Sequence, residues 1–396
     1  MDREGPVGAD VETGLEREGA LVHHRPAAEP IRILMVAGGT GGHIFPALAV
    51  AEELRARAAA RETVESPCQI EFLGTGRGLE ARLIPRAGFP LRTVSAAGLK
   101  GIGGWRRLRN FLVLPRSAVE TALILREDQP SVVVGIGGYV AGPAMLEAAL
   151  KDIPTLLIEP NAVPGFTNRV LAPVVRKAAV GFEEAAVYYG SKAVVTGHPV
   201  RRGFFAVPRR EHIPPFTILV LGGSQGSRAI NDCVVNSLAV LAKWAGPPRF
   251  IHQTGERDYN AVRQAYQERG FPAEVVAFIE DVPGALARAD LVISRAGASA
   301  VAELAAAGRA AVLIPFPDAA DQHQLGNARV LARAGAARII EQHELTPERL
   351  IAEVGDLLGA PSRLNEMAAA ARPLARPDAA QRIADLVECL ARRSEF

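Results

Sequence analysis

The chain has 396 residues, of which 48% are hydrophobic and 22% charged, so it can bury one or two full cores and is not an intrinsically disordered chain. Lysine and arginine total 45 against 43 acidic residues, and this net charge of +2 argues against an extended nucleic-acid-binding surface. The three cysteines lie far apart without metal-ligand spacing, which fits a reducing cytoplasm. No run approaches the roughly 20 apolar residues that a membrane-spanning helix needs.

Residues 1–30 contain acidic residues, glycines and prolines without apolar periodicity. This stretch lacks the apolar segment that is typical of a secretion signal. We therefore interpret it as a flexible N-terminal extension and begin the folded part at residue 31.

Apolar runs and helical patterns alternate from residue 31 onward, which is typical of a parallel sheet covered by helices on both faces. Residues 31–36 form the first run, which ends in glycines at 38–42 and is followed by a helical pattern at 46–60. Further strands are predicted at 69–73, 131–136, 154–158, 178–180 and 193–196.

The same order of strand, glycine loop and helix restarts at residue 216. There, strands are predicted at 216–221, 249–252, 274–278, 291–294, 311–314 and 337–340. This weak duplication predicts an α/β fold of two Rossmann-like, doubly wound domains facing a cleft, at 31–197 and 198–365. Residues 366–396 read as C-terminal helices, which we expect to pack back toward the N-terminal domain.

Three glycine loops follow predicted strands, at 38–42, 135–138 and 222–226. A strand that ends in glycines and opens a helix forms an anion site, although a tight turn alone also requires glycine. The dinucleotide-binding motif fits poorly, because Ile44 stands where its third glycine belongs and the next strand ends in Leu73-Gly74 instead of an acid. The sequence also contains no Walker A motif.

Two further segments carry polar groups after strands in the second half. Glu303 falls in the first turns of a helix that follows residues 295–297, where a carboxylate could accept two ribose hydroxyls. The alternative is an acid that is simply favoured by the helix N-terminus. Asp321, Gln322, His323, Gln324 and Asn327 suit the hydroxyls of a sugar, although a solvated loop would look similar.

The motifs together resemble those of a known family. They read GGTGGHIFP (38–46), GIGGYVAGP (135–143), EPNAVPGFTNR (159–169), GHPVR (197–201), GGSQGSR (222–228), RAGASAVAE (295–303) and DQHQLGN (321–327). In order and spacing, over some 300 residues, they resemble the MurG family of bacterial UDP-N-acetylglucosamine:N-acetylmuramyl-(pentapeptide) pyrophosphoryl-undecaprenol N-acetylglucosaminyltransferases. The resemblance implies the GT-B glycosyltransferase fold.

By the same resemblance, the donor nucleotide is held mainly by the C-terminal domain. The implied donor-binding residues are Thr40, Gly41, Gly42, Asn161, Arg201, Ser224, Ile279 (through its backbone), Ala298, Ser299, Ala300, Val301, Ala302, Glu303 and Gln324. The chain departs from the family pattern at Ile158 and Pro160, which replace His and Gln, at His198, which replaces Asn, and at Ala300, which replaces Thr or Ser.

His43 is the predicted catalytic base. It lies just past the first glycine loop at a helix N-terminus, whose positive end favours the neutral imidazole that can accept a proton. The alternative is a histidine that only orients the loop. Leaving-group charge would fall on the 222–226 loop, Ser224 and Arg201. The chain has no Asp-x-Asp motif, so neither an essential metal nor another cofactor is implied.

The acceptor in this family is lipid I, an undecaprenyl diphosphate that carries N-acetylmuramyl-pentapeptide, and the product is lipid II. Gly137, Gly138 and Tyr139 are predicted to hold the acceptor diphosphate. The segment with Trp105, Arg106, Arg107, Leu108, Arg109, Phe111 and Leu112 suits contact with anionic lipid, although an ordinary amphipathic helix would look similar.

The resemblance therefore implies a cytoplasmic enzyme that is peripheral on the cytoplasmic face of the cell membrane. Its implied partners are UDP-N-acetylglucosamine, lipid I, anionic lipid and proteins of cell-wall synthesis and division, with no nucleic acid. The alternatives are a UDP-N-acetylglucosamine 2-epimerase, another GT-B lipid glycosyltransferase, and a non-catalytic nucleotide-binding protein.

Overall fold

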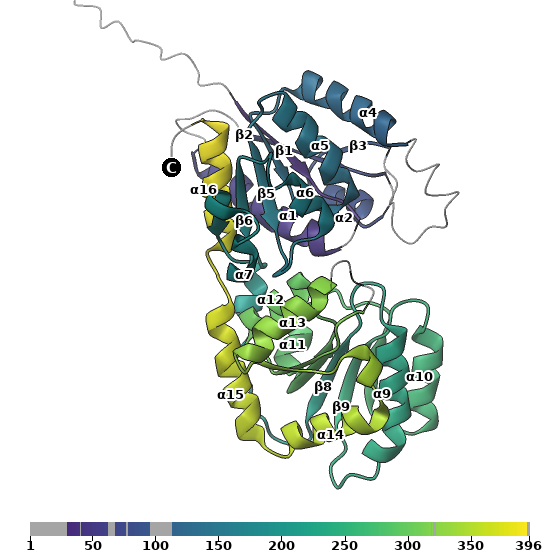
Figure 1. Ribbon diagram of the computed structural model, residues 1–396. Coiled ribbons are helices and arrows are strands. Elements are labelled where there is room, and N and C mark those ends of the chain that lie inside the picture. The colour runs from purple at the N-terminus through teal and green to yellow at the C-terminus, as the bar shows by residue number, and fades with distance from the viewer. Residues whose placement is uncertain are drawn as a thin grey trace, which may run out of the picture.

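The computed structural model describes residues 30–39, 41–61, 68–76, 78–95, 113–317, 319 and 322–393, which form two α/β domains (Figure 1). Thr40, Asp321, the extension at 1–29 and the predicted membrane segment at 105–112 lie outside the described residues. Within the described part of the chain, no helix is long and apolar enough to cross a membrane.

The N-terminal domain is built on a seven-stranded parallel sheet. In spatial order its strands are β3 (Leu91–Thr93), β2 (Cys68–Gly74), β1 (Ile31–Val36), β4 (Val132–Gly135), β5 (Thr155–Glu159), β6 (Lys177–Val180) and β7 (Ala193–Val195). Strand β3 was not predicted, because it has only three residues and is partly exposed, so it has no continuous apolar run.

Helices cover both faces of this sheet (Figure 1). They are α1 (Gly41–Arg61), α2 (Glu80–Arg86), α4 (Val113–Asp128), α5 (Gly138–Leu150), α6 (Phe166–Leu171), α7 (Glu183–Ala186) and the 3-10 turn η1 (Gly190–Lys192). Alternate residues of β1 point to opposite faces, since Ile33 packs with α1 while Leu34 packs with α5. The first helix begins at Gly41 and not at Pro46 as predicted, so the last two glycines of the loop and His43 form its first turn.

The C-terminal domain repeats this plan with a six-stranded parallel sheet. In spatial order its strands are β10 (Ala273–Val276), β9 (Arg249–Gln253), β8 (Thr217–Leu221), β11 (Leu291–Ser294), β12 (Ala311–Leu313) and β13 (Ala337–Ile339). Its helices are α8 (Arg202–Phe205), α9 (Arg228–Leu241), α10 (Tyr259–Glu268), α11 (Val282–Arg288), α12 (Ala298–Ala307), α13 (His323–Arg333), α14 (Pro347–Leu358) and α15 (Pro361–Ala371), with 3-10 turns η3 (Gln342–Glu344) and η4 (Arg372–Leu374). The prediction of two doubly wound domains is confirmed.

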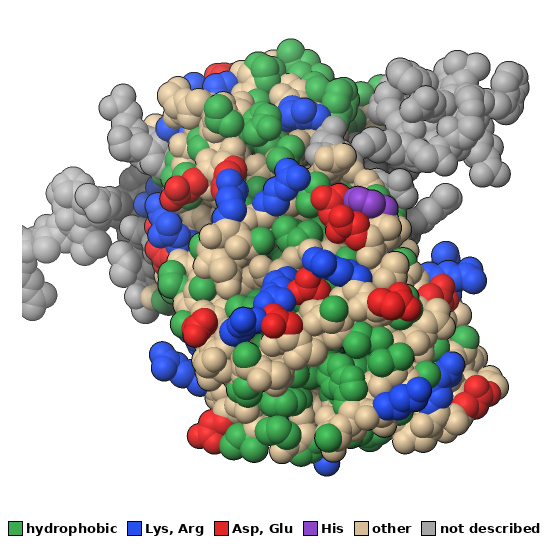
Figure 2. Space-filling view, turned by 60° about the horizontal axis from the view of Figure 1, so that its bottom comes forward, with side chains coloured by type: hydrophobic (Ala, Val, Ile, Leu, Met, Phe, Trp, Pro, Cys, Tyr) green, Lys and Arg blue, Asp and Glu red, His purple; other side chains and the backbone are tan. Residues whose placement is uncertain are grey.

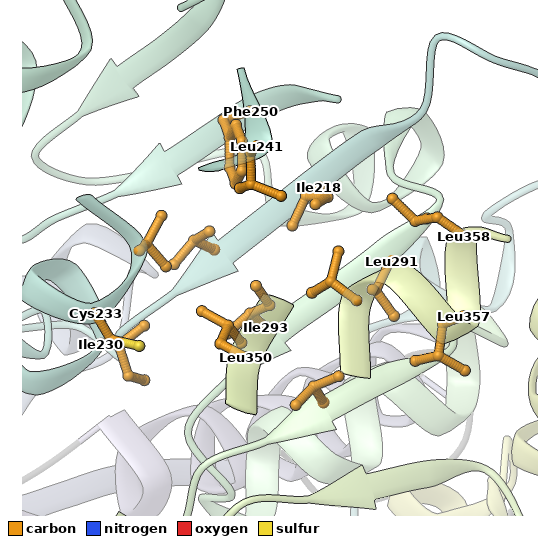
Figure 3. Packing of buried hydrophobic residues seen from close by; sticks show 14 of the residues in the cluster. Ile218, Ile230, Cys233, Leu241, Phe250, Leu291, Ile293, Leu350, Leu357 and Leu358 are labelled. Carbon is orange, nitrogen blue, oxygen red and sulfur yellow. The ribbon is translucent and has the colours of Figure 1, made fainter. Parts of the chain in front are cut away.

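One face of this second sheet packs against α9 and α14. Figure 3 shows Ile218 and Ile293 of the strands enclosed by Ile230 and Leu241 of α9 and by Leu350 of α14. These side chains are at most 4% exposed, so the strands that carry the site are fixed by apolar burial on both faces.

The last helix, α16 (Ala379–Ala391), leaves the C-terminal domain and packs against α1 (Figure 1). Its Ile383 and Val387 are fully buried in the N-terminal core. The C-terminal helices were predicted to begin at residue 366, which falls inside α15. This helix packs on the C-terminal domain, so the chain returns to the N-terminal domain between η4 and α16.

Both sheets reverse their strand order next to the first strand of the domain. In the N-terminal sheet, β1 lies between β2 and β4, and in the C-terminal sheet β8 lies between β9 and β11. Loops that leave two such neighbouring strands diverge to opposite faces and open a crevice at the carboxyl edge of the sheet. All three predicted glycine loops follow one of these strands: β1, β4 or β8.

On the face shown in Figure 2, Lys and Arg side chains are interspersed with Asp and Glu. Attraction between exposed charges of opposite sign is local, as in the ion pair between Arg288 and Glu274.

Candidate functional site

The first glycine loop is held by a buried carboxylate that the sequence analysis did not single out. Glu80, at the start of α2, is fully buried. It accepts a hydrogen bond from the backbone N–H of Gly39 at 3.3 Å and another from the hydroxyl of Thr75. Gly39 has φ 96°, a conformation that favours glycine. Glu80 thus fixes the backbone immediately before α1.

His43 has the tautomer and the protonation state that a base requires. Its Nδ1 lies 3.3 Å from the carbonyl oxygen of Gly38, which can only accept, so Nδ1–H is the donor. The lone pair of the neutral ring is therefore on Nε2. Burial lowers the pKa of His43 below its ordinary value, and the nearby His323 lowers it further. The imidazole is thus neutral at pH 7.

The second glycine loop lies against His43. A Cβ atom at Gly138 would be 3.5 Å from His43 Nδ1, and one at Gly137 would be 3.1 Å from Asn168 Oδ1. Both glycines have positive φ, so the turn into α5 needs them for conformation as well as for space. The loops after β1 and β4 therefore meet at His43, because these two strands are neighbours in the sheet.

Glu159, at the end of β5, connects this loop to Asn161, which the family resemblance implies in donor binding. It is fully buried and accepts hydrogen bonds from Asn161 N at 2.8 Å, Asn161 Nδ2 at 3.1 Å, Asn168 Nδ2 at 2.7 Å and Tyr189 OH at 3.3 Å. Burial raises the pKa of Glu159 to about 7, although these hydrogen bonds oppose the shift. One carboxylate thus orients both asparagines.

The third glycine loop, after β8, depends on close contact between backbones. A Cβ atom at Gly226 would be 1.9 Å from the carbonyl oxygen of Thr254, so no larger residue fits. Gln253 Nε2 donates to the Gly223 carbonyl at 2.7 Å. Ser224 is exposed at the tip of this loop. The tip of the loop is therefore exposed, while the contacts at Gly223 and Gly226 hold the rest of the loop in place.

A buried polar network supports this loop from behind. Asn231 Nδ2 donates to the Thr254 carbonyl at 2.9 Å, and His252 Nε2 lies 3.1 Å from Asn231 Oδ1. Burial lowers the pKa of His252 to about 3, so the ring is neutral, with Nε2–H donating to Asn231 and Nδ1 accepting from Tyr266 OH at 3.1 Å. These residues were not predicted from the sequence, because they are distant along the chain and come into contact only in the folded protein.

Glu303 is the sixth residue of α12, so it lies past the first turn, where a helix N-terminus stabilises an acid. That effect falls off within the first turn. Burial raises the pKa of this partly buried carboxyl to about 7, and the positive charge of Arg201 offsets part of the increase. The Arg201 guanidinium lies 5.4 Å from the ring of Phe45 in α1 and 5.2 Å from the ring of Phe204 in α8. Arg201 therefore contacts both domains beside Glu303.

Gln324, on α13, accepts hydrogen bonds that hold the loop before α12 (the α12 loop, residues 295–297). Its Oε1 accepts from Phe316 N at 3.0 Å and from Ala296 N at 3.3 Å. Among the other implied donor residues, Ala298 and Val301 are buried, while Ile279 lies in the loop between β10 and α11. The carboxyl edge of the second sheet thus gathers the implied donor residues that lie after β8, β10, β11 and β12.

Two departures from the family pattern contact each other. His198 is buried and hydrogen-bonds the Pro160 carbonyl, and burial lowers its pKa to about 4. Ile158 lies in the N-terminal core, where an apolar side chain fits. Ala300 has no hydroxyl, but the Oγ of the neighbouring Ser299 is buried and has no hydrogen-bond partner among the described residues.

The two domains meet at a pocket of about 290 Å³. It is lined by Ala162, Val163 and Glu184 of the first domain and by Gly326, Arg329 and Arg333 of the second. In the part of the chain that the structure describes, no group of three or more His, Cys, Asp or Glu side chains is arranged to hold a metal ion.

Two doubly wound domains with glycine loops at both switch points form the GT-B fold, and His43 lies against two of these loops in the first domain. Residues 33–180 match the glycosyltransferase family 28 N-terminal domain, and residues 217–383 match its C-terminal domain. The chain belongs to glycosyltransferase family 28.

The chain is similar over most of its length to curated proteins with one name. It is 44% identical, over 90% of this chain and 92% of the relative, to the UDP-N-acetylglucosamine--N-acetylmuramyl-(pentapeptide) pyrophosphoryl-undecaprenol N-acetylglucosamine transferase of Myxococcus xanthus. The protein of that name from Syntrophotalea carbinolica is also 44% identical, over 89% of this chain and 97% of its own.

Solved structures agree with this relationship. Acinetobacter baumannii MurG superimposes with a TM-score of 0.73 at 35% identity, covering 91% of this chain and 99% of that one. A Neisseria meningitidis UDP-GlcNAc 2-epimerase superimposes with a TM-score of 0.63 at 14% identity, covering 90% of this chain and 100% of that one. The second likeness shows the shared fold alone.

Replacing His43 with alanine should lower kcat by roughly 100- to 10,000-fold, the usual loss when a general base is removed. Donor affinity should change little, because the base acts on the acceptor proton. Steady-state kinetics and calorimetry with UDP-N-acetylglucosamine measure the two effects separately. A variant that keeps more than about a tenth of the wild-type turnover would show that His43 only orients the loop.

Affinity for UDP-N-acetylglucosamine should rise with pH through about 7, because burial holds the pKa of Glu303 near that value and only the carboxylate can accept two ribose hydroxyls. The phosphates of this ligand stay ionised throughout, so they add no pH dependence. Glu303→Gln should weaken binding by about 1.5–3 kcal/mol, the worth of a charge-assisted hydrogen bond, and flatten the pH profile. Calorimetry from pH 5.5 to pH 8.5 provides the measurement. An unchanged profile in the variant would assign the titration to another group, such as Glu159.

Proposed function

We propose that this chain transfers N-acetylglucosamine from UDP-N-acetylglucosamine to the 4-hydroxyl of the muramyl residue of undecaprenyl-diphosphate-MurNAc-pentapeptide (lipid I), with inversion, to give lipid II. The observation that carries the proposal is the meeting of His43 with the loops after β1 and β4, opposite the α12–α13 region of the second domain. The name shared by relatives that are 44% identical over about 90% of the chain specifies the donor and the acceptor.

The reaction is a direct displacement. The acceptor hydroxyl oxygen attacks the anomeric carbon of the donor sugar, the bond from that carbon to the diphosphate oxygen breaks, and His43 Nε2 accepts the hydroxyl proton. The products are the glycoside and UDP. Because the neutral ring has its lone pair on Nε2, proton transfer needs no prior change of tautomer.

Charge that develops on UDP would be stabilised by groups that already point outward. The loop at 222–226 would offer backbone N–H groups at the start of α9, and the exposed side chains of Ser224 and Arg201 would add a hydroxyl and a positive charge. Gly137 and Gly138, at the start of α5, would hold the acceptor diphosphate in the same way. In this proposal Glu303 binds the ribose, and the Ile279 backbone binds the uracil.

A UDP-N-acetylglucosamine 2-epimerase is the second candidate, because it shares the fold. It would not need an acceptor site in the first domain. In this proposal the glycine loop that approaches His43 at Gly138 is the acceptor site that an epimerase would not need.

An apolar strip on the N-terminal domain supports contact with the membrane that contains lipid I. Three neighbouring helices each expose a pair of apolar side chains four residues apart. The pairs are Val119 and Leu123 on α4, Leu146 and Leu150 on α5, and Phe166 and Val170 on α6, and all are at least 46% exposed. In the sequence, the predicted membrane segment at 105–112 immediately precedes α4.

Patches of exposed apolar side chains on neighbouring helices are typical of interaction surfaces. In this proposal the strip attaches the enzyme peripherally to the cytoplasmic face of the membrane. There it would contribute to peptidoglycan synthesis and, through it, to cell shape and division. Contacts with other proteins of cell-wall synthesis would follow from that location.

UDP release from UDP-N-acetylglucosamine, followed with and without a lipid I analogue, tests the proposed reaction. We expect release only with the acceptor, together with a disaccharide product that mass spectrometry can detect. Equal release without the acceptor, or formation of an epimerised donor, would contradict transfer.

Changing Leu123, Leu150 and Phe166 together to glutamate should reduce binding to vesicles that contain phosphatidylglycerol by more than tenfold. Burying one such side chain is worth roughly 1.5–3 kcal/mol, and each new carboxylate repels the anionic surface. Sedimentation with vesicles measures binding, and a water-soluble acceptor analogue shows whether the site is intact. Val240→Glu, on α9 of the other domain, is the matched control and should bind like the wild type. Wild-type binding by the triple variant would place the membrane contact elsewhere.

A further inference from the structure

Asn327 joins the two domains through a fully buried side chain. It lies on α13 of the C-terminal domain, and its Oδ1 accepts from the backbone N–H of Ala162 in the N-terminal domain at 2.9 Å. Its Nδ2 donates to Asn161 Oδ1 at 3.1 Å and to the Ala296 carbonyl at 3.2 Å. Both hydrogens of the amide nitrogen are therefore used, one toward each domain.

On the donor side, α13 hydrogen-bonds both backbone polar groups of one residue, Ala296. Gln324 and Asn327 are three residues apart and so lie on one face of the helix. Gln324 accepts from Ala296 N, while Asn327 donates to Ala296 O. Ala296 lies two residues before α12, which carries the implied donor residues through Glu303. The position of Asn327 is thus linked to the order of the α12 loop.

On the acceptor side, the connection runs through Asn161. Its Oδ1 accepts from Asn327 and its Nδ2 donates to Glu159, which also holds Asn168 beneath Gly137. A continuous chain of hydrogen bonds and close contacts therefore leads from the α12 loop, through Asn327, to the glycine loop beside His43.

Two ion pairs that cross between the domains are of a different kind. Arg333 lies 2.5 Å from Glu184, with side chains 65% and 40% exposed, and Arg202 lies 3.5 Å from Glu53, with Arg202 88% exposed. Exposed ion pairs contribute little and are screened by salt, whereas a buried amide that loses its partners is costly.

We infer that Asn327 is a positioning residue that couples order in the loop before α12 (the donor loop, residues 295–297) to order in the glycine loop beside His43 (the acceptor loop, residues 135–138). The inference rests on the proposed function, which requires the donor loop and the acceptor loop to be held in register across the two domains. By reciprocity, order in the acceptor loop would in turn stabilise the donor loop.

Hydrogen exchange measured by mass spectrometry tests the coupling without any acceptor. In the wild type, UDP-N-acetylglucosamine should slow exchange at 222–226 and 295–303 and also at Gly137 and Gly138, which are not among the implied donor contacts. In Asn327→Ala, donor affinity should change by less than about threefold and protection at 222–226 and 295–303 should remain, but protection at Gly137 and Gly138 should disappear. Transfer should show at least a tenfold loss of kcat.

Arg333→Ala is the matched control, since it removes a contact between the domains from the same helix, and it should keep protection and kcat within twofold of the wild type. Asn327→Asp retains an acceptor for Ala162 N–H but cannot donate to Asn161 or Ala296, so it should behave like the alanine variant. It decides the question if the alanine variant fails to fold.

Three outcomes would overturn the inference: donor-induced protection at Gly137 and Gly138 that persists in both Asn327 variants, an equal loss in Arg333→Ala, or a more than tenfold loss of donor affinity in folded Asn327 variants. The last outcome would make Asn327 part of the donor site itself. Failure of the proposed function is distinguishable, because a chain that transfers no sugar to lipid I but shows coupling that depends on Asn327 would contradict only the transfer.

Discussion

Parallel strands end at the same edge of a sheet, and this constraint places every group proposed to act in the reaction. Three glycine loops follow strands next to the positions where strand order reverses, β1 and β4 in one sheet and β8 in the other. Because helices leave on opposite faces there, backbone N–H groups open into the crevice between them. With two such edges facing each other, a negatively charged donor and a negatively charged acceptor can be held without a large net positive charge on the protein.

Buried side chains, not the glycines alone, hold these loops in place. Glu80 fixes the loop before α1, Glu159 orients Asn161 and Asn168, and Asn231 holds the strand end against which Gly226 packs. A backbone loop is an effective anion site only when its dipoles are oriented in advance, since reorienting them during the reaction would cost part of the stabilisation. These buried residues would thus influence the reaction by orienting the loops, without contacting the substrates themselves.

Burial also sets the protonation states in the site. It lowers the pKa of His43 and raises the pKa values of Glu159 and Glu303 to about 7. A neutral imidazole and two carboxyl groups that ionise near neutrality thus make the site sensitive to pH around 7.

Much of this organisation was predictable from local patterns. Near-continuous apolar runs that alternate with helical patterns predicted two parallel sheets, and the spacing of seven motifs predicted the family, because strand burial and glycine conformation act over a few residues. The start of α1 at Gly41, the short strand β3, and the bracing roles of Glu80, Asn231 and Asn327 were not predictable in this way. Each depends on partners distant in sequence: Asn327 meets Asn161 166 residues away, and α16 returns to cover α1. The sequence by itself determined which residue types stand after which strands, whereas the tertiary structure alone decided which buried polar groups face one another, because hydrogen bonds between distant segments leave no periodicity in the chain.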